Sequence, residues 1–251
     1  MINKQSVSIF LLITFFVTWQ ILESFTINEF SSTNDSFYTI KIFSDYILCI
    51  ILFYLIIKVG YQQNLNFRFN STFVRTGILS LTLLLVVFTN KSFLVLTIVS
   101  TFLAATSEEL VFRGLIFPSS FKLFKDSKLV KSAIFSSLLF GAIHLLHLLK
   151  YPEHYIGIIL QSFAAFSLGI LLCYILIKTS NIIVVSLLHF SVNLFLKNPE
   201  RANDPLNYVD LNGVTYDLTG LAVTVSVIIF IGLFSIFKIR KINPVIHLNP
   251  T

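Results

Sequence analysis

Six side chains capable of acid–base or electrostatic chemistry stand inside long apolar stretches of this sequence. They are Glu108, Glu109, Arg113, His144, His189 and Asn193. Carboxylate and imidazole groups accept and release protons, and imidazole and amide N–H groups stabilise a developing oxyanion. Hydrolysis of a peptide bond needs a nucleophile or an activated water, a base and an oxyanion site. The set contains groups of each kind.

The two adjacent carboxylates are predicted to have different partners. Glu109 and Arg113 are four residues apart, so they share one face of a helix and can form an ion pair. Glu108 points about 100° around the helix from Glu109 and lacks this cation. A carboxylate that is partly out of water holds a proton more readily, which suits a general base. We therefore expect Glu108 to meet a side chain of another helix or a water-filled cavity.

His189 and Asn193 are also four residues apart, so they point the same way. An imidazole and an amide on one face can donate to one ligand atom, as a developing oxyanion requires. Taken singly, a histidine or an asparagine in an apolar helix is more often a hydrogen-bonded packing residue. The joint occurrence of three polar groups on three apolar stretches indicates a site.

The composition requires membrane helices to position these side chains. The chain has 251 residues, of which 55% are hydrophobic and only 12% are charged. A soluble domain carries about a quarter charged residues, and in lipid only helices or closed barrels satisfy the backbone. The apolar runs are unbroken rather than alternating, which selects helices. The predicted fold is an all-α, polytopic membrane helix bundle of about eight transmembrane helices, forming one membrane domain over residues 1–251.

A membrane span needs roughly 20 mostly apolar residues. The segments that meet this criterion, including a short seventh, are Val7–Ile27, Ile40–Gly60, Phe73–Thr89, Phe93–Phe117, Leu129–Leu149, Tyr155–Lys178, Ile182–Leu196 and Leu218–Ile239. Ionisable residues cost about 2.5–3.5 kcal/mol at a helix centre, and we place the exceptions in the fourth, fifth and seventh segments. The motif-bearing core therefore covers about residues 90–200.

The charged residues predict the orientation of the chain. Basic and acidic connections alternate along the sequence, which places both termini in the cytoplasm of a multi-pass plasma-membrane protein. The net charge of +6 follows from the same bias. The basic residues are dispersed, so nucleic-acid binding is not indicated. Cys49 and Cys173 lie inside apolar runs and are expected to act as small hydrophobic residues rather than as a disulfide.

The three groups resemble the motifs of a known family in order and spacing. They are Glu108-Glu109-x-x-x-Arg113, Phe140-x-x-x-His144 and His189-x-x-x-Asn193. The family is that of the CPBP intramembrane proteases, also called the Abi or type II CAAX prenyl protease-like family. The resemblance covers the motif-bearing core and implies a CAAX-protease-like fold that hydrolyses peptide bonds within or near the membrane.

The resemblance also implies a role for each residue. Glu108 corresponds to the general base that activates water, and His144 to its partner in holding that water. His189 and Asn193 correspond to the pair that stabilises the oxyanion. Glu109 and Arg113 correspond to supporting positions that set the helix and tune the site.

The same resemblance implies the partners. Eukaryotic members trim prenylated CAAX tails, and bacterial members include proteins linked to bacteriocin self-immunity and peptide maturation. We therefore expect the substrate to be a membrane peptide or a lipidated protein at the lipid bilayer. The sequence indicates no particular oligomeric state.

The sequence leaves the chemistry of activation open. Ser107 and Ser191 face away from the acid–base groups, so no serine nucleophile stands out and activated water is the simpler proposal. Glu108, His144 and His189 would be the ligands of a two-His, one-Glu zinc site, with Glu109 as the base. No cofactor is certain, and we favour the metal-free role.

Two other functions compete with proteolysis. The first is a non-catalytic bacteriocin self-immunity or scaffold membrane protein in which the motifs are a relic of the fold. The second is a small transporter with Glu108 as a proton carrier. The transporter is less favoured because the chain shows no inverted repeat and no matching pair of Gly/Pro-broken helices.

Overall fold

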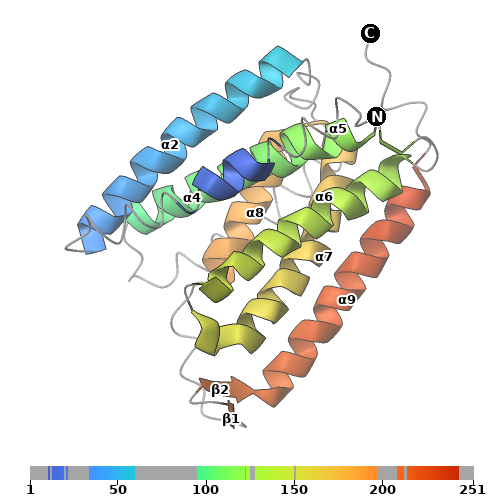
Figure 1. The fold of residues 1–251 in the computed structure, drawn as a ribbon. Helices are drawn as coiled ribbons and strands as arrows, with labels where there is room; N and C mark the ends of the chain where they lie inside the picture. Colours follow the sequence, from blue (N-terminus) through green and yellow to red (C-terminus); the bar gives the residue numbers. More distant parts are fainter. Residues whose placement is uncertain are drawn as a thin grey trace. The chain divides into compact units, whose positions relative to one another are not determined.

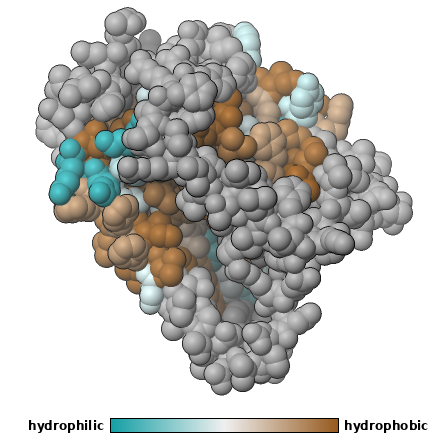
Figure 2. Space-filling model, turned by 180° about the vertical axis from the view of Figure 1, so that it is seen from behind, coloured by the Kyte–Doolittle hydropathy of each residue, from teal (hydrophilic) through white to brown (hydrophobic). Residues whose placement is uncertain are grey.

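The computed structural model describes most of the expected helices and groups them into two compact units. The described residues are 11, 13–19, 21, 34–59, 95–121, 123–124, 128–149, 151–196, 208–211 and 214–242. Unit 1 comprises Met1–Leu123 and Ile175–Asn198, and unit 2 comprises Phe124–Tyr174 and Pro199–Thr251. Nearly all of the described chain is helical (Figure 1). Hydrophobic residues cover most of the described surface that is visible in Figure 2.

Unit 1 is built on one long interrupted helix and its two neighbours. The long helix begins as α4, Val95–Glu109, continues as a π-helix, Leu110–Ile116, and ends as the short α5, Phe117–Ser120. The neighbours are α2, Asn34–Val59, and α8, Ile182–Leu196. Both pack against α4 and also touch the π-helix.

Aromatic and aliphatic side chains hold α8 against α4. Ala105, Phe190 and Leu194 form a buried cluster. Phe102 meets Phe190 edge to face, with ring centroids 5.4 Å apart. Residues three or four apart lie on one face of a helix, so Phe102 and Ala105 form one side of this interface and Phe190 and Leu194 the other. The interface lies beside the carboxylates at the end of α4.

Unit 2 contains the remaining helices and a small hairpin. Its elements are α6, Lys128–His144; two 3-10 helices, Leu145–Leu149 and Pro152–His154; α7, Tyr155–Thr179, whose last residues belong to unit 1; β1, Tyr208–Leu211; β2, Val214–Asp217; and α9, Leu218–Arg240. Within this unit α6 packs against α9, and β2 contacts α9.

The predicted helix positions agree closely with the described ones. α8 has the predicted bounds, α7 extends one residue further, and α9 extends to Arg240. α2 begins at Asn34, whereas the predicted span begins at Ile40, so six residues ahead of that span are also helical. The predicted span Phe73–Thr89 lies outside the described residues, as does much of Val7–Ile27.

Two described helical stretches are long and apolar enough to cross a membrane, judged by length and composition. They are Leu129–Leu149 and Tyr155–Thr179, and both coincide with predicted spans. The count of eight spans stays a prediction, as does the single membrane domain over residues 1–251.

The described chain is helical as predicted, apart from one two-stranded hairpin between α8 and α9. β1 and β2 pair antiparallel, with Tyr208 opposite Asp217 and Leu211 opposite Val214. The sequence between them is Asn212-Gly213, a dipeptide that favours a two-residue hairpin turn. This signal was readable from the sequence and was overlooked, because the segment was assigned as a polar connection.

α6 and α7 approach each other closely at Gly141. A Cβ added to Gly141 would lie 2.8 Å from the carbonyl oxygen of Ser162. The hydroxyl of Ser162 donates to the carbonyl oxygen of Gly141 at 2.8 Å. Small residues permit such approaches between membrane helices. The contact fixes α7 against the last turn of α6, where His144 lies.

We expect Gly141→Val to destabilise unit 2, because the new side chain must displace the backbone of α7. Overpacking of this kind costs about 1–3 kcal/mol. Ala142→Val is the matched control, since Ala142 is exposed. The melting temperature in detergent, followed by the reaction of a maleimide dye with the buried Cys173 thiol, checks this. Equal melting temperatures for the two variants would contradict the close approach.

Candidate active site

The paired carboxylates stand where α4 changes into the π-helix. α4 ends at Glu109, and every residue of the π-helix is buried. Pro118, two residues after the π-helix and in the first turn of α5, has no N–H to donate to the carbonyl of Gly114. π-helical turns occur often at functional sites. The change from α-helix to π-helix thus falls directly after the acidic pair.

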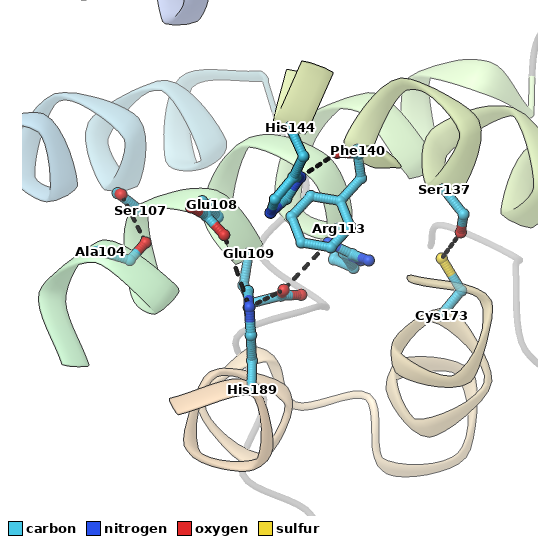
Figure 3. A network of polar contacts seen from close by, with 10 residues as sticks. All are labelled: Ala104, Ser107, Glu108, Glu109, Arg113, Ser137, Phe140, His144, Cys173 and His189. Atoms are coloured by element: carbon cyan, nitrogen blue, oxygen red, sulfur yellow. Dashed lines mark hydrogen bonds and ion pairs between the residues drawn. The ribbon is translucent and has the colours of Figure 1, made fainter. Parts of the chain in front are cut away.

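Glu109 is the centre of a buried ion network (Figure 3). Its Oε1 accepts a hydrogen bond from Nη1 of Arg113 at 3.0 Å and another from Nδ1 of His189 at 2.8 Å. The side chains of Glu109 and Arg113 are 0% exposed, and that of His189 is 3% exposed. The Glu109–Arg113 pair predicted from the sequence is confirmed. His189, on α8, is a second partner that the helical spacing did not predict.

Glu108 has a different environment from its neighbour. Its side chain is 25% exposed, and its Oε2 lies 3.6 Å from Nε2 of His189. This separation is longer than a hydrogen bond. The prediction that Glu108 meets a side chain of another helix is therefore confirmed, with His189 as that side chain. His189 stands between the accessible and the buried carboxylate, as Figure 3 shows.

The network also determines where protons must lie. A carboxylate oxygen only accepts, so Nδ1 of His189 carries a proton toward Glu109. In neutral His189, Nε2 would then present a lone pair to the Glu108 carboxylate, and two acceptors would face each other. One further proton, on Nε2 or on Glu108, removes this repulsion. With that proton, two carboxylates, one guanidinium and one imidazole carry no net charge.

His144 ends α6 in unit 2 and is half-buried. Its Nδ1 lies 2.9 Å from the carbonyl oxygen of Phe140, and the two rings meet edge to face with centroids 5.0 Å apart. Because a carbonyl only accepts, Nδ1 carries the proton and neutral His144 presents a lone pair on Nε2. Phe140 thus orients His144 through both its backbone and its ring. The approach of His144 to Glu108 stays a prediction, since the two residues belong to different units.

Asn193 lies one turn after His189 on α8 and is half-buried. Its side chain makes no hydrogen bond to the other residues that the structure describes. Residues four apart share a helix face, and the pairing of the Asn193 amide with the His189 imidazole as oxyanion donors stays a prediction.

The two serines near the site use their hydroxyl groups elsewhere. Ser107 donates to the carbonyl oxygen of Ala104 at 2.9 Å, and Ser191 donates to that of Leu187 at 2.7 Å. Both side chains are buried. A hydroxyl bound to its own helix is not placed for attack on a substrate, which agrees with the prediction that neither serine is a nucleophile.

Asp45 is a buried acid that the sequence analysis overlooked. It lies on α2 and is fully buried, on the same face as Leu48 and Leu52. α2 packs against both α4 and the π-helix. The signal was available, because an ionisable residue inside an apolar span is a functional candidate by default, and Asp45 falls inside the predicted span Ile40–Gly60.

The zinc alternative finds part of its ligand set in unit 1. Glu108 and His189 face each other, and Glu109 holds the other nitrogen of His189, as carboxylates do behind zinc-bound histidines. The third proposed ligand, His144, belongs to unit 2. Over the described part of the chain, no group of three His, Cys, Asp or Glu side chains is arranged to hold a metal ion. If zinc bound, Glu108, His144 and His189 would hold it, and it would polarise water or a carbonyl.

Comparison with known proteins identifies the segment that carries these residues. Residues 90–195 match the family model described as Type II CAAX prenyl endopeptidase Rce1-like. No curated protein and no solved structure matched the chain. The matched segment contains all six predicted site residues, and together with the apolar helices it indicates a membrane protein. The match over residues 90–195 agrees with the family that the three motifs resemble.

Proposed function

We propose that this chain is an intramembrane endopeptidase that hydrolyses a peptide bond of a membrane-associated peptide, such as a lipidated tail or a leader of the bacteriocin type. The observation that carries the proposal is the position of His189 between Glu108 and Glu109. In this arrangement Glu108 is accessible and can take a proton from water, whereas the buried Glu109 orients the imidazole of His189. The family match over residues 90–195 supports peptide hydrolysis of the CAAX type.

Glu108 acts as the general base in the proposed step. It is the more exposed carboxylate, and no hydrogen bond to His189 holds it. Glu108 takes a proton from water, the water oxygen attacks the scissile carbonyl carbon, and the C=O electron pair moves to oxygen. His144 assists by accepting, at Nε2, a hydrogen bond from the O–H that the water keeps. The proton on Glu108 then passes to the leaving nitrogen as the C–N bond breaks.

His189 and Asn193 stabilise the oxyanion in this scheme. Before attack, the Nε2–H of His189 is attracted by the charged Glu108 carboxylate, 3.6 Å away. Once Glu108 has taken the proton from water, this attraction falls and the N–H is available to the oxyanion. Glu108 thus loses its negative charge as the carbonyl oxygen gains one. The N–H of His189 becomes available at the moment when an oxyanion donor stabilises the most charge.

Glu109 and Arg113 are positioning residues. Arg113 compensates the charge of Glu109, and Glu109 fixes the imidazole of His189 by a hydrogen bond at Nδ1. A carboxylate behind a catalytic histidine sets its tautomer and stabilises its protonated form. Both residues therefore act through His189 rather than on the substrate.

The proposal places the protein in the plasma membrane as a multi-pass chain with both termini in the cytoplasm. Figure 1 shows the start of α6 and the end of α9 at one end of unit 2, and the hairpin at the other. The start of α6 and the end of α9 carry several lysine or arginine residues in the sequence, as expected if they lie on the cytoplasmic side.

The alternative is a non-catalytic bacteriocin self-immunity or scaffold protein. In that case the buried network would only join α4 to α8. Loss of the Glu108 carboxylate would then leave partner binding or protection intact, whereas the proposed enzyme would lose its function.

We expect Glu108→Gln to abolish cleavage, because the amide cannot accept the proton from water. Loss of a general base typically lowers the rate by about 10²–10⁴-fold. A quenched fluorescent farnesylated peptide, incubated with the purified chain in proteoliposomes, measures cleavage. His144→Ala should have a similar effect. Full activity of both variants, with unchanged melting temperatures, would rule out the proposed step.

We expect Glu109→Gln to reduce stability as well as activity, because it leaves Arg113 in a buried site without its counter-charge. Breaking a buried ion pair on one side costs about 3–5 kcal/mol. Glu108→Gln is the matched control, since it is the same substitution at the adjacent, more exposed carboxylate. The melting temperature should fall in the first variant only. An equal fall in both would mean that Glu108 is also a structural ion-pair residue.

We expect activity to survive treatment with a zinc chelator, because the proposed step uses only protein groups to activate water. The measurement is cleavage of the same peptide before and after chelation, with metal content determined in parallel. Loss of activity that added Zn²⁺ restores would assign Glu108, His144 and His189 as ligands instead. A chelator-treated sample with unchanged melting temperature is the control for folding.

A further inference from the structure

The C-terminal end of α9 combines an exposed apolar face with a group of cations. Along one side of the helix Gly232, Ser235 and Ile239 are buried. The other side exposes large hydrophobic side chains: Val227, Ile229, Phe230, Leu233, Phe234 and Phe237. The last residues of the helix and its following turn supply Lys238, Arg240 and Lys241. An apolar face that ends in cations is complementary to a phospholipid, whose apolar acyl chains end in an anionic phosphate.

Two of these cations are held over exposed aromatic rings. The ammonium group of Lys238 lies 5.1 Å from the ring centroid of Phe234, and that of Lys241 lies 4.2 Å from the ring centroid of Phe237. Side chains of a helix lean toward its N-terminus, so each lysine reaches the ring four residues earlier. A cation–π contact is favourable even at an exposed site. The two ammonium groups are therefore positioned before any ligand arrives.

The charge of this group is not neutralised within the described part of the chain. None of the ion pairs among described residues involves Lys238, Arg240 or Lys241. The start of α6 adds the exposed Lys131 at the same end of unit 2 (Figure 1). Cations near a helix C-terminus also favour the helix dipole, but the dipole does not require them to lie over lipid-facing rings.

We propose that this end of unit 2 binds the headgroup of an anionic phospholipid. The phosphate oxygens accept from Lys238, Arg240 and Lys241, and the acyl chains lie along the exposed side chains of Phe230, Phe234 and Phe237. Charge-assisted hydrogen bonds to phosphate are stronger than those between neutral groups, and each basic residue near an anionic leaflet contributes about 1 kcal/mol. This site does not depend on the proposed peptidase activity.

Native mass spectrometry of the full-length chain tests the site. The purified protein in detergent is given equal amounts of phosphatidylglycerol and phosphatidylcholine, and the retained lipids are counted. We expect preferential retention of phosphatidylglycerol. The triple variant Lys238→Gln, Arg240→Gln, Lys241→Gln should lose it, at roughly fivefold for each cation removed. Lys238→Arg with Lys241→Arg is the control that keeps both the charges and the ring contacts.

A second variant separates the rings from the charges. Phe237→Leu keeps an apolar side chain but removes the ring under Lys241, so it should weaken the retention of phosphatidylglycerol and leave that of phosphatidylcholine unchanged. Equal retention of the two lipids by the unchanged chain would overturn the site, and so would unchanged preference in the triple variant. Full displacement by equimolar inorganic phosphate would overturn the identity of the ligand as a lipid. If the triple variant fails to fold, Lys241→Gln alone provides the same comparison.

Discussion

A carboxylate buried among apolar helices must be paired, and Glu109 satisfies this constraint with two partners on one oxygen. Arg113 comes from the π-helix and His189 comes from α8. Breaking such a pair costs more than its formation gains, because an isolated buried charge is very unfavourable. The network therefore fixes the distance between the end of α4 and the middle of α8. The position of His189 next to Glu108 follows from it.

The same hydrogen-bond logic orients both histidines but leaves them electrostatically different. Each has its Nδ1 proton directed to an oxygen and presents Nε2 to the site. The acceptor is a carboxylate for His189 and a neutral backbone carbonyl for His144. A carboxylate stabilises an imidazolium, whereas a carbonyl adds no charge. This difference suits His189 to donate a hydrogen bond to the oxyanion and His144 to accept a hydrogen bond from the attacking water, which are the roles that the proposed step requires.

The sequence was sufficient wherever the determining interaction is local. The Glu109–Arg113 pair follows from helical spacing, and the bounds of α8 follow from an apolar run of defined length. The contact of His189 with both carboxylates depends on how α8 packs against α4, which no spacing encodes. The π-helix has no hydrophobic pattern of its own, although Pro118 marks its end. The sequence did contain a signal for Asp45, an ionisable residue in an apolar span, and for the β1–β2 hairpin, whose strands are separated by Asn-Gly in the sequence.

Separate features of unit 2 control the placement of His144. The stretch Leu129–Leu149 has 21 residues, and at about 1.5 Å per residue it matches a hydrocarbon core of about 30 Å. Lys131 near its start and the exposed Tyr151 after its end are residues that prefer the interface, so we expect them to set the depth of α6 in the membrane. The contact of Gly141 with Ser162 fixes its rotation against α7, and Phe140 fixes the tautomer of the imidazole. A lipid phosphate bound at the end of α9, which packs against α6, would hold the same depth more firmly.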